Sequence, residues 1–413
     1  MKSILFLSAL DFKEKSIQVI RKTPEAFAQD SWSVDYILSR DESKYGPYFY
    51  EKVINPTNIN VIRFPMPLTA LRNSLPNNIF QVIVTKIASY FTIIKLASKA
   101  SKLLKTKKYD VVYGYEIHGV MALRILKFFG LLKNLKTVSR FQGTWITEYK
   151  KNKRYLKLLL NWEVIAAMRF KSDLCIMTDD GTEGDFFFEK RKHIKNFHFW
   201  VNGVDKPILN KSVSEEIVKK YKIENTFLFI SVCRLESWKR VDRIIRTISL
   251  LINKHQFTGF KFLVIGEGSE KQNLIDLAKS ENVKEYIEFV GAVAQNQVKH
   301  YLNEADIFFS TYDLSNVGNP LLEAIRANKI IFTLNNGTTN KWIQYEENGF
   351  IYDVSDRLYE QMSDDVIRVL NDSQLKENIL TKIRNTEQSK LWDWKTRLEA
   401  EVLEVNKIVN IDK

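Results

Sequence analysis

The sequence predicts an α/β protein of two domains, each a parallel β-sheet covered by helices, and three observations support this prediction. The chain has 413 residues, more than one ordinary hydrophobic core accommodates, so two domains are expected. Short apolar runs of strand length alternate with amphipathic helical patterns, as in βαβ units. Apolar residues then become sparse over residues 206–225, which favours a domain border there.

Six apolar runs in the first half are expected to form the strands of a first domain over residues 1–205. They are residues 4–8, 34–38, 61–64, 111–115, 137–141 and 174–178. The first run follows Met1 closely and has some likeness to a weak signal peptide. Because the run is short and charged residues follow it at once, we interpret it as a strand.

The second half shows the pattern more clearly and is expected to form a domain over residues 206–388. Its strands are predicted at residues 227–232, 262–265, 287–290, 307–309 and 330–333. Strands of this kind are typical of parallel sheets buried on both faces. Ligands bind beyond the carboxyl ends of such strands, so two facing domains would place a site in the cleft between them. The last segment, residues 389–413, is predicted to be a helix over 391–410.

Composition indicates a folded protein, with 45% hydrophobic and 27% charged residues. The two cysteines, Cys175 and Cys233, lie in apolar runs, so buried reduced thiols are expected and no disulfide framework. The chain has no run of roughly 20 uninterrupted apolar residues, the length of a membrane span. We therefore predict a cytoplasmic location and leave membrane association on the cytoplasmic face open.

Positive charge is concentrated in the first half of the chain. Residues 1–200 hold 33 Lys or Arg and 18 Asp or Glu, a net charge of +15, whereas residues 201–413 hold 29 and 31, a net charge of −2. Residues 77–108 mix apolar side chains with seven lysines, and residues 123–136 and 149–160 are similar. This composition suits contact with anionic lipid headgroups. The alternative is a core helix with a solvated basic face. Nucleic-acid binding is not favoured, because no recognition motif is present.

Two cations follow the first strand of the second half. Arg234 and Lys239 come directly after the run at 227–232, where the end of a strand would direct them into the cleft. There they would neutralise a diphosphate. The alternative is a pair of solvated surface cations, which are common at strand ends.

A loop of small residues opens a later helix in the same half. Ser315, Asn316, Val317, Gly318 and Asn319 precede a helical run that contains Leu322 and Glu323. Pro320 suits the first helical turn, and free amides before it bind an anion or a sugar oxygen. A carboxylate one turn into the helix accepts hydrogen bonds from sugar hydroxyls. The alternative is a well-capped helix with a surface Glu323.

Other strand ends supply weaker candidates. Gly266 and Gly268 follow the strand at 262–265 and form either a ligand-binding turn or a plain strand–helix connection. In the first half, the candidates for the acceptor side of the cleft follow the runs at 111–115 and 137–141, and the alternatives are a β-turn and packed side chains. They are Glu116, His118, Arg140, Gly143 and Thr144, together with Gln142. The histidines and cysteines show no metal-ligand spacing.

Four stretches together resemble the retaining GT-B glycosyltransferases of family 4 (glycosyl transferases group 1). They occur in the order and spacing of that family: Val201-Asn202-Gly203-Val204-Asp205, the segment from Arg234 to Asp242, Val264-Ile265-Gly266-Glu267-Gly268, and Gly318-Asn319-Pro320-Leu321-Leu322-Glu323-Ala324. The likeness is specific over residues 200–395 and topological before that. It implies two Rossmann-like domains facing a cleft, with the N-terminal domain binding the acceptor and the C-terminal domain binding the donor. The C-terminal helix would cross back to the first domain.

The resemblance also implies roles for particular residues. Arg234 and Lys239 would bind the donor diphosphate, Glu323 the ribose hydroxyls, and the loop from Ser315 to Asn319 the donor sugar and phosphate. Catalysis would then depend on Arg234, Lys239, Glu323 and Gln142, with Gly266, Gly268 and Leu322 lining the donor site. Two positions depart from the family: Ser315 replaces a glutamate, for which Asp313 would be a partial substitute, and Gln142 replaces a histidine.

These observations lead to one expected activity and one alternative. The first is a retaining, metal-independent hexosyltransferase that moves a sugar from a nucleotide-diphosphate donor, a UDP-sugar in preference to a GDP-sugar. Its acceptor would be a saccharide or lipid-linked saccharide in cell-surface polysaccharide biosynthesis, without a further cofactor. The alternative is a non-catalytic subunit of the same fold that supports a partner glycosyltransferase. Expected partners are the donor, the acceptor and an anionic membrane that contacts the basic first domain.

Overall fold

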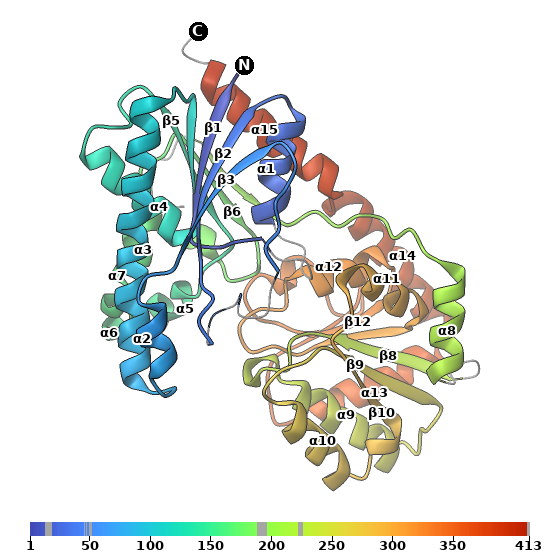
Figure 1. Cartoon of the computed structure of the whole chain (residues 1–413). Helices are drawn as coiled ribbons and strands as arrows, with labels where there is room; N and C mark the ends of the chain where they lie inside the picture. The colour runs from blue at the N-terminus through green and yellow to red at the C-terminus, as the bar shows by residue number, and fades with distance from the viewer. Residues whose placement is uncertain are drawn as a thin grey trace. The chain divides into compact units, whose positions relative to one another are not determined.

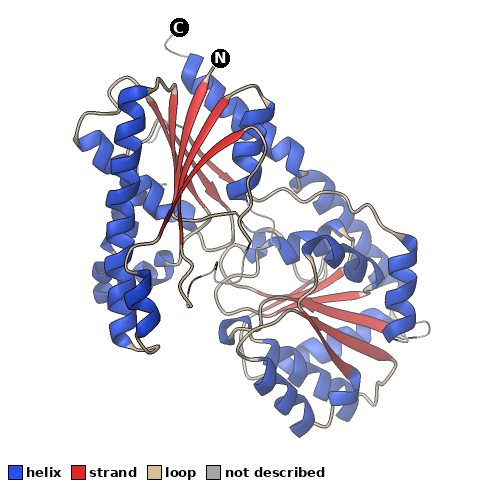
Figure 2. Cartoon of the chain, in the orientation of Figure 1, coloured by secondary structure: helices blue, strands red, loops and turns tan. Residues whose placement is uncertain are grey.

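The computed structural model describes residues 1–12, 19–44, 46, 48, 52–187, 196–221 and 226–410. The chain divides into two compact units (Figure 1). Unit 1 comprises residues 1–179, 184–201 and 395–413, and unit 2 comprises residues 180–183 and 202–394. The domain borders expected from the sequence lie after residues 205 and 388. Each unit is a β-sheet with helices on its faces (Figure 2).

Unit 1 is built on a seven-stranded parallel sheet of order β3-β2-β1-β4-β5-β6-β7. Its strands are β1 (Ser3–Ser8), β2 (Ser33–Arg40), β3 (Ile59–Pro65), β4 (Val111–Tyr115), β5 (Lys136–Phe141), β6 (Leu174–Thr178) and β7 (Phe197–Trp200). Every residue of β4 and β6 is buried, as expected for a parallel sheet covered on both faces. The six predicted strands are all present, whereas β7 was not predicted.

The helices of unit 1 cover both faces of this sheet (Figure 2). They are α1 (Val19–Gln29), α2 (Thr69–Ser74), α3 (Ile79–Thr106), α4 (Glu116–Phe128), α5 (Ile146–Lys151), α6 (Tyr155–Leu160), α7 (Trp162–Met168), the 3₁₀ turn η1 (Gly184–Phe187) and α15 (Trp394–Asn410), of which the part from residue 395 belongs to this unit. Asn78 caps α3, because its side chain accepts hydrogen bonds from the N–H groups of Phe80 and Gln81. Apolar residues from α3, α4 and α7 form one core with the sheet.

Unit 2 is built on a six-stranded parallel sheet of order β10-β9-β8-β11-β12-β13. Its strands are β8 (Phe227–Val232), β9 (Phe260–Ile265), β10 (Ile287–Gly291), β11 (Ile307–Ser310), β12 (Ile330–Leu334) and β13 (Phe350–Tyr352). The five predicted strands are present, and the short β13 is additional. The order reverses at β8, since β9 follows on one side of it and β11 pairs on the other. At such a switch point, loops that leave the carboxyl ends of neighbouring strands diverge and leave room for a ligand.

The helices of unit 2 again cover both faces of its sheet (Figure 2). They are α8 (Lys211–Tyr221), η2 (Ser237–Lys239), α9 (Val241–Asn253), α10 (Lys271–Ser280), η3 (Lys284–Tyr286), α11 (Gln295–Glu304), α12 (Asn319–Arg326), η4 (Thr339–Lys341), α13 (Leu358–Asn371) and α14 (Ser373–Lys390). In α9, Val241, Ile244, Ile245, Ile248 and Leu251 are buried. Their helical spacing makes the apolar stripe that packs on the sheet.

The last helix, α15, docks on unit 1 through a buried cluster of charges. Glu401 is fully buried, bonds Tyr113 Oη, and accepts a hydrogen bond of 2.9 Å from Arg397. Arg140 Nε lies 3.8 Å from the same carboxylate. The two guanidinium groups outweigh burial and hold the pKa of Glu401 below its usual value. Three charged side chains therefore share one low-dielectric site, where each depends on the others.

Candidate functional site

The loops that follow β8 and β9 pack directly on each other in unit 2. Leu235 N donates to Glu267 O at 2.9 Å, and Cys233 N donates to Ile265 O at 3.0 Å. Gly266 has a φ of 140°, and a Cβ added there would lie 1.7 Å from Cys233 O. An added Cβ at Gly268 would lie 2.3 Å from Leu235 O. Both glycines are therefore needed for backbone packing, independently of any ligand.

Lys239 is held between two aromatic rings at the end of the β8 loop. Its Nζ lies 3.9 Å from the ring centroid of Trp238 and 3.6 Å from that of Tyr312. Burial lowers the pKa of Lys239 to about 8, and the positive charge of Arg234 adds to this effect. A cation that is partly stripped of water and placed near a second cation gains strongly from an anionic partner.

Arg234 is the exposed member of this pair of cations. Its backbone lies between the buried residues Cys233 and Leu235, whose side chains anchor the loop. The structure thus brings together the two cations predicted from the sequence. One is fixed by aromatic rings, whereas the other reaches solvent.

Glu323 lies one turn into α12. Its Oε1 accepts a hydrogen bond of 3.1 Å from Gln295 Nε2 at the start of α11. Burial raises the pKa of Glu323 to about 7. Gly318 precedes the helix in extended conformation and Pro320 lies in its first turn, so the backbone at the start of α12 has the predicted form. A fixed carboxyl beside a helix N-terminus suits a ligand that carries hydroxyl and phosphate groups.

Asn316 braces the loop between β11 and α12 from within. Its Oδ1 accepts from Tyr312 N at 2.9 Å, and its Nδ2 donates to Asn336 Oδ1 at 2.8 Å. Asn336 Nδ2 in turn donates to Tyr312 O at 2.5 Å. Asn316 is 1% exposed, so it fixes the shape of the loop and presents no side chain at the surface.

Ser315 is also turned into unit 2. Its Oγ donates to Asp180 O at 2.8 Å and accepts from Val317 N at 3.1 Å. The short segment 180–183, which belongs to unit 2 although it comes from the first half of the chain, is held in this way. Asp313 pairs with Arg243 at 2.8 Å and Arg240 at 3.4 Å. The suggested substitute carboxylate is thus engaged in ion pairs.

The other side chains of the loop are packed or paired. Val317 and Leu322 are buried. Asn319 Oδ1 accepts a hydrogen bond of 3.1 Å from Asn202 Nδ2. The sequence motif that contains Asn202 is therefore joined within unit 2 to the motif that begins at Gly318.

In unit 1, Gln142 joins the ends of β4 and β5. Its N–H donates to Glu116 Oε1 at 2.7 Å, and its Nε2 donates to Tyr115 Oη at 2.5 Å. Glu116 begins α4 with a φ of 58°, a left-handed conformation that is strained for a residue with a side chain. Gly143 follows Gln142 with a φ of 104°. Glu116, Gln142 and Gly143 thus lie together at the carboxyl end of this sheet, as predicted.

His118 and Thr144 are less available for binding an acceptor than the sequence suggested. His118 Nε2 lies 2.6 Å from Ser89 Oγ, and burial lowers its pKa to about 4. The imidazole is therefore neutral at pH 7 and bonded to α3. Thr144 is 4% exposed, and its Oγ1 accepts from Ile146 N at 3.3 Å.

Arg140 differs from its predicted place on the acceptor side. Its side chain is fully buried, and it lies beside Glu401 of α15. From its place at the end of a strand, Arg140 was expected to face the ligand cleft. In the structure, α15 covers that position and supplies the countercharge, so Arg140 stabilises the docking of this helix.

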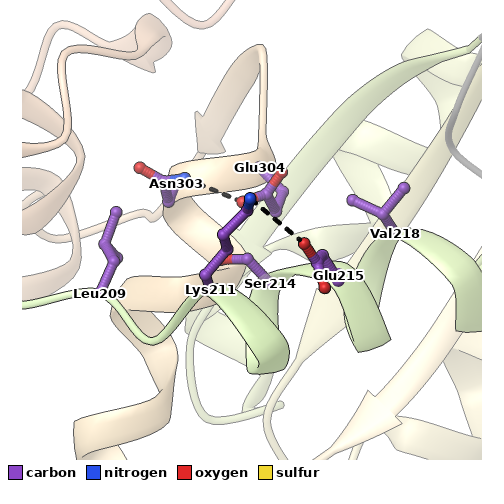
Figure 3. A pocket seen from close by; sticks show the side chains of 7 residues that line it. All are labelled: Leu209, Lys211, Ser214, Glu215, Val218, Asn303 and Glu304. Carbon is purple, nitrogen blue, oxygen red and sulfur yellow. Dashed lines mark hydrogen bonds and ion pairs between the residues drawn. The ribbon is translucent and has the colours of Figure 1, made fainter.

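A groove of about 510 Å³ lies elsewhere in unit 2, between α8 and the end of α11 (Figure 3). Lys211 and Glu215 of α8 form an exposed ion pair of 3.8 Å on one side, and Asn303 donates to Glu304 on the other. Its lining contains none of the predicted site residues. Exposed ion pairs of this kind are weak. Ser214 Oγ, which also belongs to the lining, is buried without a hydrogen-bond partner, but a single hydroxyl does not define a ligand class.

The structure adds four residues to the site that sequence reasoning did not assign. Trp238 and Tyr312 hold Lys239, Gln295 bonds Glu323, and Asp180 holds Ser315. Trp238 belongs to the Arg234–Lys239 motif and directly precedes Lys239, so the sequence could have indicated a contact between its aromatic ring and this cation. The other three are distant in sequence from their partners. Across the described part of the chain, no cluster of three or more His, Cys, Asp or Glu residues is arranged to hold a metal ion.

Several known proteins resemble this chain in sequence or in fold. Residues 213–386 match the model of the family Glycosyl transferases group 1. N-acetyl-alpha-D-glucosaminyl L-malate synthase of Bacillus anthracis is 22% identical over 76% of this chain and 81% of its own length. Alpha-monoglucosyldiacylglycerol synthase of Acholeplasma laidlawii is 24% identical over 68% and 72%. The crystal structure of Anabaena HepE in complex with UDP superposes with a TM-score of 0.68 at 16% identity, covering 98% of this chain and 100% of HepE. The two parallel-sheet units therefore have the fold of GT-B glycosyltransferases.

Proposed function

We propose that this protein is a retaining glycosyltransferase of family 4, which transfers a hexose from a nucleotide-diphosphate sugar. The observation that supports the proposal most strongly is the position of Lys239 and Glu323. Both belong to the glycosyl transferases group 1 domain, and both carry side chains whose pKa is shifted by burial. Perturbed titratable groups at the carboxyl end of a parallel sheet are typical of functional sites.

In this proposal Lys239 and Arg234 bind the donor diphosphate. Lys239 supplies a fixed charge, because Trp238 and Tyr312 limit its movement, whereas the exposed Arg234 closes on the phosphate from solvent. Glu323 accepts hydrogen bonds from the ribose hydroxyls, and Gln295 orients it. Gly266, Gly268, Leu322 and the loop from Ser315 to Asn319 shape the rest of the donor site. The donor is a UDP-sugar, which is consistent with UDP in the HepE structure.

Transfer with retention requires the donor C1–O bond to break while the acceptor oxygen bonds C1 on the same face. The leaving diphosphate oxygen takes the proton from the acceptor hydroxyl, so a protein base is not needed. The energy barrier then depends on stabilising the negative charge that develops on the diphosphate. Arg234 and Lys239 supply the positive charges that stabilise it, without a metal ion.

The acceptor is a saccharide or lipid-linked saccharide of cell-surface polysaccharide synthesis, reached at the cytoplasmic face of a membrane. The basic character of residues 1–200 supports this part of the proposal. Glu116 and Gly143 of unit 1 are the acceptor-side candidates, and Gln142 is the catalytic candidate of this unit.

The test is nucleotide release by the purified chain from a panel of UDP-sugars and GDP-sugars, with calorimetry to measure binding of UDP. We expect binding of UDP and slow release of UDP from one sugar donor. Absence of both across the panel would reject the proposal. Binding of UDP with no turnover, together with normal glycan production in cells that carry Lys239→Ala, would instead support the non-catalytic subunit.

A further inference from the structure

The N-terminal half of α3 carries an exposed apolar ridge. Its members recur every three or four residues on one helix face; they are Ile79 (65% exposed), Ile83 (48%), Ile87 (42%), Phe91 (49%) and Ile94 (55%). Phe80 and Val82 flank the ridge and are 63% and 57% exposed. In Figure 1 this end of α3, with α2 beside it, extends past the strands of the unit 1 sheet.

The short helix α6 continues this apolar surface. Tyr155, Leu156, Leu159 and Leu160 are between 60% and 70% exposed. Lys86 Nζ donates to Leu160 O at 2.7 Å, which joins the end of α6 to the middle of the ridge. The next residues reinforce the join, because the ring of Trp162 stacks on Tyr90 at 6.0 Å and donates to its Oη at 3.0 Å. We call the ridge and the exposed face of α6 the α3–α6 surface.

An apolar surface of this extent is unusual on a soluble monomer. Single exposed apolar residues are normal, but a contiguous patch on adjoining helices marks a contact site. The helix α3 is also long and apolar enough to cross a membrane, with a mean hydropathy of 1.5 over 18 residues. Its buried residues include Ala88, Ile93, Leu96 and Ala97, which pack in the core of unit 1. The helix therefore belongs to the folded unit and offers only its outer face to a partner.

Cations border the α3–α6 surface. Residues 150–157 contain five of them, Lys150, Lys151, Lys153, Arg154 and Lys157, and no acidic residue. The nearby Glu148 lies 3.7 Å from Arg154. Further along α3, Lys95, Lys99, Lys102 and Lys105 follow the ridge. Apolar side chains beside a surplus of cations match the interface of an anionic bilayer, where acyl chains lie beneath negative headgroups.

We propose that the α3–α6 surface docks unit 1 on an anionic lipid bilayer, with the ridge and α6 entering the headgroup region and the cations contacting phosphates. The charge argues against a second copy of the chain as the occupant. A twofold interface brings the same patch of both copies together, so it would place like cations opposite each other. The inference deepens the proposed function, on whose membrane-proximal acceptor it rests, but it concerns residues outside the donor site.

The test is co-sedimentation of the full chain with vesicles of phosphatidylcholine alone or mixed with phosphatidylglycerol. We expect binding to the anionic vesicles that weakens as salt is raised. The double variant Leu156→Ser/Leu159→Ser should lower the partition coefficient at least about tenfold, because two exposed leucines leave the acyl region. Lys153→Gln/Lys157→Gln should reduce the preference for phosphatidylglycerol and leave binding less sensitive to salt.

The matched control is Ile208→Ser in unit 2, an apolar side chain that is 84% exposed and is not part of the α3–α6 surface. It should bind vesicles like the unchanged chain. Thermal unfolding and binding of UDP are measured on each variant, so loss of folding and failure of the donor site are distinguished from loss of docking. The proposal is overturned if the chain does not bind anionic vesicles. It is also overturned if the chain forms a dimer in solution and the double variant Leu156→Ser/Leu159→Ser is monomeric.

Discussion

Lys239 and Tyr312, 73 positions apart in the sequence, are in direct cation–π contact, with the ammonium 3.6 Å from the ring centroid. Tyr312 is itself fixed, because its Oη donates to Val232 O at 3.1 Å and Asn316 accepts from its N–H. The cation therefore sits on a ring that is anchored to the strand before it and to the loop that precedes α12. This contact couples the two halves of the proposed donor site.

Replacement of Lys239 by Met should weaken binding of UDP about 10- to 100-fold, the effect of losing a charge-assisted hydrogen bond of roughly 1.5–3 kcal/mol. Calorimetry measures the change. Lys211→Met is the control, since that side chain is exposed in α8 of the same unit. Equal affinity of the two variants for UDP would show that Lys239 does not belong to the donor site.

The affinity for UDP should fall as pH rises above about 8. The pKa of Lys239 is lowered to about 8 by burial, so the free protein loses this charge above that pH, and a diphosphate binds the charged form more tightly than the neutral one. The apparent Kd should rise by up to about tenfold per pH unit. In Lys239→Arg, which stays charged, the rise should disappear; a rise of the same size would assign it to another group.

Below pH 7 the ribose contact should weaken instead. Burial raises the pKa of Glu323 to about 7. Below that pH its carboxylate, which accepts the hydrogen bonds from ribose, becomes a neutral carboxylic acid. UDP should lose affinity between pH 7 and pH 6, whereas a nucleotide without ribose hydroxyls should be unaffected. Glu323→Gln should remove the difference between the two ligands. Persistence of that difference would contradict the assigned role.

Introducing a carboxylate at Ser315 should destabilise the protein and not improve it. Ser315 is 9% exposed and its Oγ bonds Asp180 O, so a glutamate there would displace the segment 180–183 or bury an unpaired charge. Ser315→Ala, which loses only the hydrogen bond, should cost about 0.5–1.5 kcal/mol. Chemical unfolding compares the two variants. Higher transferase activity of Ser315→Glu would show that the family carboxylate can be restored.

Glu401→Ala should cost roughly 3–5 kcal/mol of unfolding free energy, because Arg140 and Arg397 would remain buried without a countercharge. Glu399→Ala is the control, since Glu399 is 65% exposed in the same helix. The pKa of Glu401 is lowered from 4.5 in the folded chain. Its contribution is therefore complete above the unfolded value and is lost as pH falls through the folded value. A neutral effect of Glu401→Ala would show that the cluster is not stabilising.

The strands were predictable where burial on both faces made them continuously apolar, as in Val111–Tyr115 and Leu174–Thr178. By contrast, β7 was missed because Phe197–Trp200 is half-buried and contains a histidine, so it lacks that pattern. The three residues of β13 are too few to show a recognisable pattern of apolar residues. Chain-local signals thus identify central strands better than edge strands.

Site residues could be predicted from the sequence where a single short motif contains both the residue and the strand end or helix start that positions it. Arg234, Lys239 and Glu323 follow strand ends or open a helix, and the structure places them in unit 2 at the carboxyl ends of its strands. Arg140 could not be placed in this way. Its surroundings depend on α15, which begins more than 250 positions later in the sequence. Burial of a charge by a distant element leaves no trace in the local sequence.

The discontinuous sequence of unit 1 sets an order for folding during synthesis. Residues 202–394 can emerge from the ribosome and complete their own sheet, but Glu401 lies beyond them. Until that residue has left the exit tunnel, the guanidinium of Arg140 has no buried carboxylate as its partner. The part of unit 1 that α15 covers stays exposed to water for the same time. The nascent chain should therefore finish the later unit before the earlier one, and chaperones would meet an incomplete first unit throughout that interval.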